Sequence, residues 1–185
     1  MTPHPTPPRA PRPLDDARLR ELALSYVGRF ATTRAKLVTY LRRKLRERGW
    51  SGANDPALAE LAERLARLGY IDDAAYALAK ARSLGQRGYG ARRVDVALRQ
   101  AGVGEDDGQP ARVASADAAV SSAVRFAQRK RIGPFGIAEH DLKQRQRDLS
   151  AMIRAGHDFE LAKRIVGMAP GAEPDLDLIV NLLLN

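Results

Sequence analysis

Residues 68–77 read LGYIDDAAYA, with two adjacent carboxylates between apolar residues in a chain that is otherwise strongly basic. If the glycine ends one helix, Asp72 is suited to the N-cap of the next, where its carboxylate accepts a hydrogen bond from a free backbone N–H. Asp73 follows in the first turn, where negative charge meets the positive end of the helix dipole. Ile71 and Tyr76 take the two positions of a hydrophobic staple. The stretch therefore predicts a joint between two helices.

The alternative role for the aspartate pair is a metal or acid–base site. Such a site needs more ligands, and His4, His140 and His157 are all distant in the sequence. The P-loop, GxSxG and HExxH patterns are absent as well. We therefore expect no catalytic residues, no metal and no cofactor, and a protein that is not an enzyme.

Glycines that can end helices recur along the chain, each four positions after an apolar residue. The pairs are Leu45 with Gly49, Leu98 with Gly102, and Met152 with Gly156. The three glycines lie 53 and 54 residues apart, a spacing typical of tandem helical repeats. Glycine after a helix can adopt the left-handed conformation without a Cβ penalty, so each is predicted to end its helix.

Apolar residues before these glycines have helical spacing. They are Leu37, Leu41 and Leu45, then Val94, Ala97, Leu98 and Ala101, and, less regularly, Leu142, Leu149, Met152 and Ile153. A further helix is expected to start at Asp55-Pro56, with Leu58, Leu61, Leu65 and Leu68 on its buried face. No alternating strand pattern occurs. The predicted fold class is all-α, built from tandem three-helix, helix-turn-helix-like repeats.

The positions of prolines and helix-ending glycines divide the chain into five parts. Residues 1–13 contain 6 of the 11 prolines and are predicted to be a disordered tail. Three helical repeats are expected over 14–52, 53–104 and 105–166, and a C-terminal extension over 167–185. The Gly- and Asp-rich residues 104–110 are predicted to form a linker between the second and third repeats.

Composition limits the class of protein. The 185 residues carry a net charge of +9, with 44% apolar and only 5% aromatic residues. Such basicity favours a partner that carries phosphates or an acidic surface. There is no cysteine, which excludes disulfides and thiol chemistry. Without an apolar run of about 18 residues or a signal-peptide segment, we expect no membrane association and a cytoplasmic location.

Basic side chains concentrate in the first and third repeats. Residues 14–50 carry 10 basic and 4 acidic side chains, 51–109 carry 8 and 9, and 110–166 carry 11 and 6. The candidate binding residues are Arg34, Arg42, Arg43, Arg46, Arg92, Arg99, Arg129, Lys130 and Arg131. The guanidinium group of arginine can form two parallel hydrogen bonds with a phosphate or a carboxylate. The alternative interpretation of any single run of basic residues is a helix face that is simply exposed to solvent.

Aromatic residues add little to this picture. Trp50, Tyr76 and Phe126 are better explained as core or staple residues, so exposed rings for base stacking are not evident. Sequence-specific recognition of single strands is therefore not expected. A DNA-binding helix-turn-helix remains open, because short helices joined by glycine turns are what that motif uses.

The central stretch resembles the signature of the RecX family. The matching residues are Gly69, Tyr70, Ile71, Asp72, Asp73, Tyr76, Ala77, Arg82, Gly88, Arg92, Arg93, Val94, Leu98, Gly102 and Val103. Weaker matches to the outer repeats extend the resemblance over roughly residues 20–166. The Pro-rich tail, the spacer 132–136 and the acidic-to-apolar end at 173–180 depart from the family pattern.

The resemblance implies a bacterial regulator of RecA, with an elongated and curved arrangement of three-helix repeats. Such proteins bind in the groove of the filament that RecA forms on single-stranded DNA, and they usually inhibit RecA. We accordingly expect the RecA filament and single-stranded DNA as partners, contacted through the basic residues named above. We expect a monomer, since no exposed apolar helix face is evident. The alternatives are a basic DNA-binding protein that acts without RecA and, more remotely, a small hydrolase or nuclease.

Overall fold

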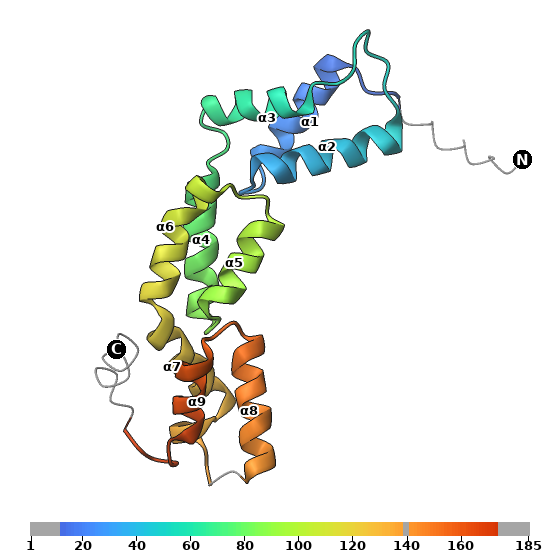
Figure 1. Cartoon of the computed structure of the whole chain (residues 1–185). Helices are drawn as coiled ribbons and strands as arrows, with labels where there is room; N and C mark the ends of the chain where they lie inside the picture. The colour runs from blue at the N-terminus through green and yellow to red at the C-terminus, as the bar shows by residue number, and fades with distance from the viewer. Residues whose placement is uncertain (1–11, 139–140, 174–185) are drawn as a thin grey trace, which may run out of the picture. The chain divides into compact units, whose positions relative to one another are not determined.

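The computed structural model describes residues 12–138 and 141–173, and the fold is all-α (Figure 1). Within these ranges there are nine α-helices and one short 3₁₀ helix, no β-strand forms, and 69% of the structure is helical. The chain divides between Asp72 and Asp73 into two compact units. The all-α class predicted from the helical spacing is confirmed.

The first unit contains three helices around one core. They are α1 (Asp16–Val27), α2 (Arg34–Arg48) and α3 (Leu58–Arg67). Side chains cap the first two: the Asp15 carboxylate accepts a hydrogen bond from the N–H of Arg18, and the Thr33 hydroxyl accepts one from the N–H of Lys36. The buried residues of the core are Leu14, Leu19, Ala23, Leu37, Leu41, Leu58, Ala62, Leu65 and Ile71. The helical spacing of α2 therefore identified its buried face.

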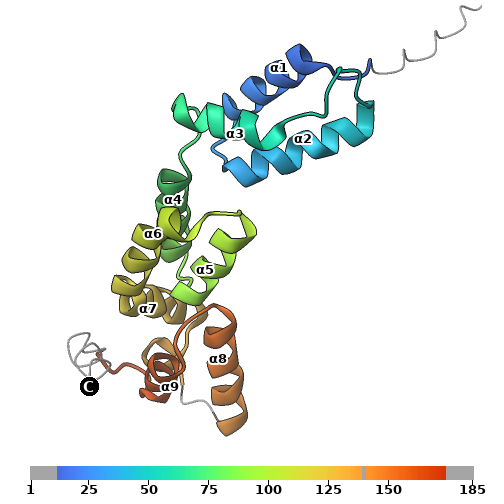
Figure 2. The same cartoon turned by 45° about the horizontal axis from the view of Figure 1, so that its top comes forward.

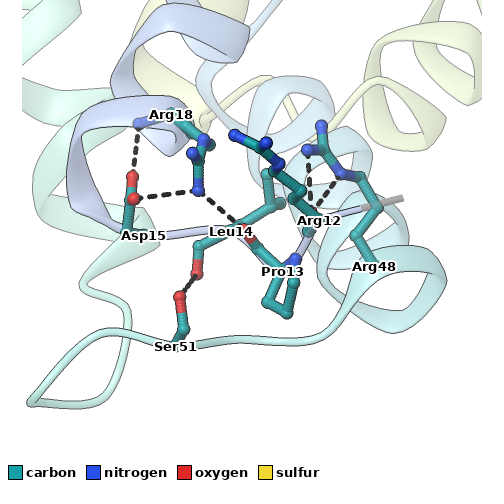
Figure 3. Close-up of polar contacts among 7 residues, drawn as sticks. All are labelled: Arg12, Pro13, Leu14, Asp15, Arg18, Arg48 and Ser51. Carbon is teal, nitrogen blue, oxygen red and sulfur yellow. Dashed lines mark hydrogen bonds and ion pairs between the residues drawn. The ribbon is translucent and has the colours of Figure 1, made fainter. Parts of the chain in front are cut away.

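The segment before α1 is tied to the end of α2 (Figure 3). The N–H of Leu14 donates to the Gly49 carbonyl at 3.0 Å, and the N–H of Ser51 donates to the Leu14 carbonyl at 2.8 Å. The Arg48 guanidinium donates to the Arg12 carbonyl at 3.0 and 2.9 Å. Arg12 falls within the predicted tail but is anchored here, and the preceding part of that tail lies outside the described residues.

The next three helices form the second core. They are α4 (Asp73–Gln86), α5 (Ala91–Gln100) and α6 (Glu105–Asp117). Because α4 begins at Asp73, Asp72 stands at the N-cap position. Ile71 is buried in the first core, and Tyr76 packs against the second, so the staple contact between them stays a prediction. The buried residues of the second core are Ala77, Ala81, Leu84, Val94, Leu98, Ala101, Val103 and Ala111.

The remaining helices form the third core. They are α7 (Ala119–Lys130), the 3₁₀ helix η1 (Gly133–Phe135), α8 (Leu142–Arg154) and α9 (Phe159–Gly167). Its buried residues are Ala123, Phe126, Ala127, Ile132, Met152, Ala155, Leu161, Ala162, Ile165 and Val166. The irregular apolar pattern of α8 is only partly buried: Leu142 is 80% exposed and Ile153 is at the surface, while Asp148 is buried. The C-terminal extension beyond residue 173 lies outside the described residues.

Helices α3 and α6 group differently from the boundaries expected from the sequence. Helix α3 packs against α2 in the first core, and α6 packs against α4 in the second. The expected boundaries at 52/53 and 104/105 instead placed each of them at the start of the following repeat. A leucine stripe shows that a helix has a buried face, but it does not show which neighbour covers that face.

The predicted linker at 104–110 is wrong, because α6 begins at Glu105 and includes Pro110. Three acidic residues in its first turn, including Glu105, stabilise the positive end of the helix dipole. Gly108 and Ala111 are buried on the face toward α4. This packing offsets the cost of a proline inside the helix. The glycine- and aspartate-rich composition of residues 104–110 did not indicate that such packing would occur.

The glycines with repeating spacing each follow the middle helix of a three-helix set. Gly49, Gly102 and Gly156 follow α2, α5 and α8, with φ of 80°, 67° and 93°. These values lie in the left-handed region, where a side chain would be strained. The repeat seen in the sequence therefore corresponds to a recurring helix end.

Within the second unit, the α4–α5 turn packs on the α8–α9 turn (Figures 1 and 2). The N–H of Gly90 donates to the Ala155 carbonyl at 3.0 Å. The ring Nε2 of buried His157 lies 3.1 Å from the Gly88 carbonyl oxygen. A Cβ on Gly90 would overlap the Gly156 carbonyl, so the backbones approach too closely for any side chain there. This contact joins the second and third cores.

Candidate nucleic-acid interface

Three predicted binding residues form an exposed cluster on α2, the α2 cluster: Arg42, Arg43 and Arg46. All three are exposed, on the side of α2 opposite the buried Leu37 and Leu41. In the described part of the chain, Arg42 and Arg46 have no ion-pair partner, and their spacing of four places them on neighbouring turns. Their charges are therefore available to an external anion.

The remaining member of the cluster is partly neutralised by Glu47. The Arg43 Nε lies 3.6 Å from one Glu47 oxygen, and the Lys44 Nζ lies 2.6 Å from the other. The hydrogen bond from Lys44 lowers the pKa of Glu47. Such exposed pairs contribute little to stability and exchange readily for other partners. Arg43 therefore remains accessible to an incoming phosphate.

Arg34 lies in different surroundings from the α2 cluster. Its guanidinium contacts both Glu63 carboxylate oxygens at 3.2 Å, which ties the start of α2 to α3. Its side chain is also less exposed than that of Arg43. The geometry favours a structural role within the first unit over a contact with a ligand.

The predicted residues of α5 are exposed and paired with carboxylates. Arg92 NH2 lies 3.4 Å from Asp158, and Arg99 pairs with Asp95. Asp95 also holds Arg112 of α6 at 3.0 Å, so it is shared between two arginines. Both α5 arginines can reach a ligand only by leaving these weak surface pairs.

The three predicted basic residues at the end of α7 differ in their surroundings. Arg129 donates to the Arg87 carbonyl, and its guanidinium lies over the Tyr89 and Phe126 rings at 5.9 and 5.4 Å. Lys130 is exposed with no ion pair among the described residues. Arg131 adopts a left-handed conformation, with φ of 56°, and turns the chain into the segment before η1. Lys130 and Arg131 therefore remain open to solvent, whereas Arg129 braces the α4–α5 turn.

A basic surface on α8 was not predicted. The α8 stripe consists of Lys143, Arg147 and Arg154 with the polar Gln146 and Ser150, which together line a shallow hollow of about 390 Å³. All five are exposed, and the three cations have no ion-pair partner in the described ranges. Spacings of four and seven residues place the three cations on one helix face, although they are not adjacent in the sequence. That periodicity was the available signal.

Two features of the described residues concern the metal and acid–base chemistry considered above. Among the described residues, no group of three His, Asp or Glu side chains is arranged to hold a metal ion. His157 follows Gly156 in the α8–α9 turn and is buried, and burial lowers the pKa of its imidazole despite the opposing hydrogen bond to Gly88.

No helix within the described ranges is both long and apolar enough to cross a membrane.

Comparisons with known proteins identify similar chains. No family model matches the sequence. The chain is 34% identical over 174 residues to the regulatory protein RecX of Myxococcus xanthus (strain DK1622), covering 88% of this chain and 91% of that protein. It is 29% identical over 160 residues to the regulatory protein RecX of Agrobacterium fabrum, covering 85% and 86% of the two chains.

A solved structure has the same fold. The crystal structure of RecX from Lactobacillus salivarius matches with a TM-score of 0.59 at 17% identity, over 88% of this chain and 96% of that one. At this identity the match shows the all-α fold alone. The sequence relatives confirm the resemblance inferred from the central motif.

Proposed function

The chain belongs to the RecX family, and on that premise we propose that it binds the filament that RecA forms on single-stranded DNA. It modulates, mostly by inhibition, the recombinase, ATPase and coprotease activities of RecA in DNA repair. It acts as a cytoplasmic monomer and catalyses no reaction of its own.

The observation that carries the proposal is a set of exposed cations that have no carboxylate partner in the part of the chain that the structure describes. On α2, Arg42 and Arg46 are exposed and unpaired within the described ranges, and the α8 stripe adds three more cations on one helix face. Cations on exposed helix faces bind a phosphate backbone by releasing its counterions. The paired Arg92 and Arg99 are secondary contacts under this proposal.

The main alternative is a basic protein that binds DNA without RecA. The same exposed cations support it, because phosphate contacts carry no information about the protein already on the DNA. The two proposals differ in the ligand that is bound most tightly. The alternative requires tight binding to naked DNA that weakens steeply with salt.

One experiment separates them. RecA ATPase on single-stranded DNA is measured while this protein is titrated, and binding to the same DNA without RecA is measured in the same buffer. We expect ATPase to fall at protein concentrations below that of RecA, with weak binding to naked DNA. Unchanged ATPase together with tight binding to naked DNA would refute regulation of RecA.

A further inference from the structure

Three aromatic rings lie in a row on the surface of the first unit. This aromatic ladder consists of Phe30, Tyr26 and Tyr40. The Tyr26 and Tyr40 rings stack at 4.2 Å between centroids with an interplanar angle of 16°, and Phe30 continues from Tyr26 at 5.3 Å with a tilt of 48°. The rings come from α1, from the turn after it and from α2, so tertiary packing assembles the ladder.

The two ends of the ladder differ. Tyr26 and Tyr40 are half-buried against the first core, but Phe30 is 57% exposed. At the other end, the Arg43 guanidinium carbon and the Lys44 Nζ lie 5.6 and 6.0 Å from the Tyr40 ring centre. The ladder therefore presents one open aromatic ring and one end covered by cations.

The backbone holds Phe30 in place although its side chain is exposed. The N–H groups of Phe30 and Arg29 donate to the Tyr26 carbonyl at 3.1 and 3.2 Å, which fixes the turn at the end of α1. A phenylalanine that is more than half exposed forfeits much of the stability that burial of its ring would contribute. Packing of the first core therefore does not explain an aromatic residue at this position.

We propose that the aromatic ladder is a stacking platform for an unpaired base of single-stranded DNA. The base stacks on Phe30, and the exposed Arg29, next to it in the chain, contacts the adjacent phosphate. Arg43 lies at the Tyr40 end of the ladder, where it contacts a phosphate further along the strand. Exposed rings flanked by cations are the combination by which proteins hold single strands without reading their sequence. Bases in a duplex are already stacked on each other, so the site selects single strands. The proposal deepens the proposed function and rests on it for the identity of the ligand.

The favoured occupant follows from the chemistry of the site. An acidic segment of a partner protein could satisfy the cations, but it would leave the open Phe30 face without a flat partner. A nucleotide supplies both a ring and a negative charge at adjacent positions. The sequence pattern had indicated no exposed ring for stacking, because the exposure of Phe30 depends on how α1 and α2 pack.

The test compares two strands that differ only in their bases. Binding of the full chain to fluorescent oligothymidine, and to an abasic strand of equal length, is measured by anisotropy at about 50 mM salt, where phosphate contacts are strong. Stacking of one base accounts for about 5- to 150-fold in affinity. We expect Phe30→Ala to lose an effect of this size on oligothymidine and to bind the abasic strand like the unmodified protein.

Two variants control for other effects. Phe30→Trp keeps a flat ring and should retain oligothymidine binding. Tyr70→Ala removes another ring of the first unit, 55% exposed but outside the ladder, and should leave binding unchanged. Thermal unfolding of each variant, followed by circular dichroism, shows whether the first unit remains folded.

Three results would overturn the stacking platform. An equal loss on both strands means that Phe30 acts through the fold, and no loss on either strand means that it makes no contact. Loss of RecA-filament binding with unchanged oligothymidine binding assigns the ring to a protein partner. Failure of the proposed function looks different: the unmodified protein would leave RecA ATPase unchanged while the dependence on bases and on Phe30 persists.

Discussion

The α8 stripe allows a quantitative prediction for DNA binding. Replacement of Lys143, Arg147 and Arg154 by glutamine removes three exposed cations that have no ion-pair partner within the described ranges. Each phosphate contact with a single strand contributes about 0.7 to the slope of log affinity against log salt concentration, so the slope should become shallower by about 2. The loss of affinity should then be about 20-fold larger at 50 mM than at 200 mM salt.

The assay is anisotropy of a fluorescent single strand titrated with protein at four or more salt concentrations. The matched control replaces Arg20, Arg64 and Arg67 by glutamine, which changes the net charge equally. Those arginines are interspersed with Asp16 and Glu60 around a different hollow, in the first unit, so their loss should change the slope little. If both triple variants have the same slope, the α8 stripe does not contact phosphates and the reasoning from unpaired cations fails.

Three further predictions concern the other surface and the core. Reversing all charges of the α2 cluster to glutamate should weaken filament binding by about tenfold or more at 0.1 M salt without changing thermal unfolding, and unchanged affinity would remove that face from the interface. Gly88→Ala should lower the free energy of unfolding by about 2–4 kcal/mol, because φ is 76° and the new Cβ would lie 2.8 Å from the Phe126 backbone nitrogen. The control Gly85→Ala should not destabilise the protein, because the space around Gly85 is open. Burial lowers the pKa of His157, so the unfolded state binds more protons below pH 6.5 and stability should fall as pH drops from there toward the lowered pKa. Denaturant unfolding across pH 5–8 should show that His157→Gln loses this part of the pH dependence, and an identical pH profile would contradict it.

Local sequence patterns identified most of the helices and several of their ends, although the start expected at Asp55-Pro56 is wrong, because α3 begins at Leu58 without a side-chain cap. The spacing of Leu37 and Leu41 identified the buried face of α2, and the spacing of Gly49, Gly102 and Gly156 identified three helix ends with left-handed backbones. These features depend on neighbouring residues, because a helix repeats its contacts every three to four positions. The central motif also indicated the family that the sequence relatives confirm.

Features that depend on several helices could not be obtained in this way. The leucine stripe of α3 does not show that α2 covers it, and Pro110 argues for a loop until the burial of Ala111 against α4 is known. The adjacent cations of α2 were visible in the sequence, but the pairing of Arg34 with Glu63 was not, because 29 residues separate the two.

The sequence by itself therefore determined the all-α class, the repeating helix ends, the basic character and the family. Tertiary structure decided which helices share a core, which arginines are neutralised by carboxylates, and that Phe30 remains exposed beside Tyr26 and Tyr40. The physical reason is the range of the interactions. Helix periodicity and caps arise within a few residues, whereas ion pairs, ring contacts and exposure arise between segments that only folding brings together.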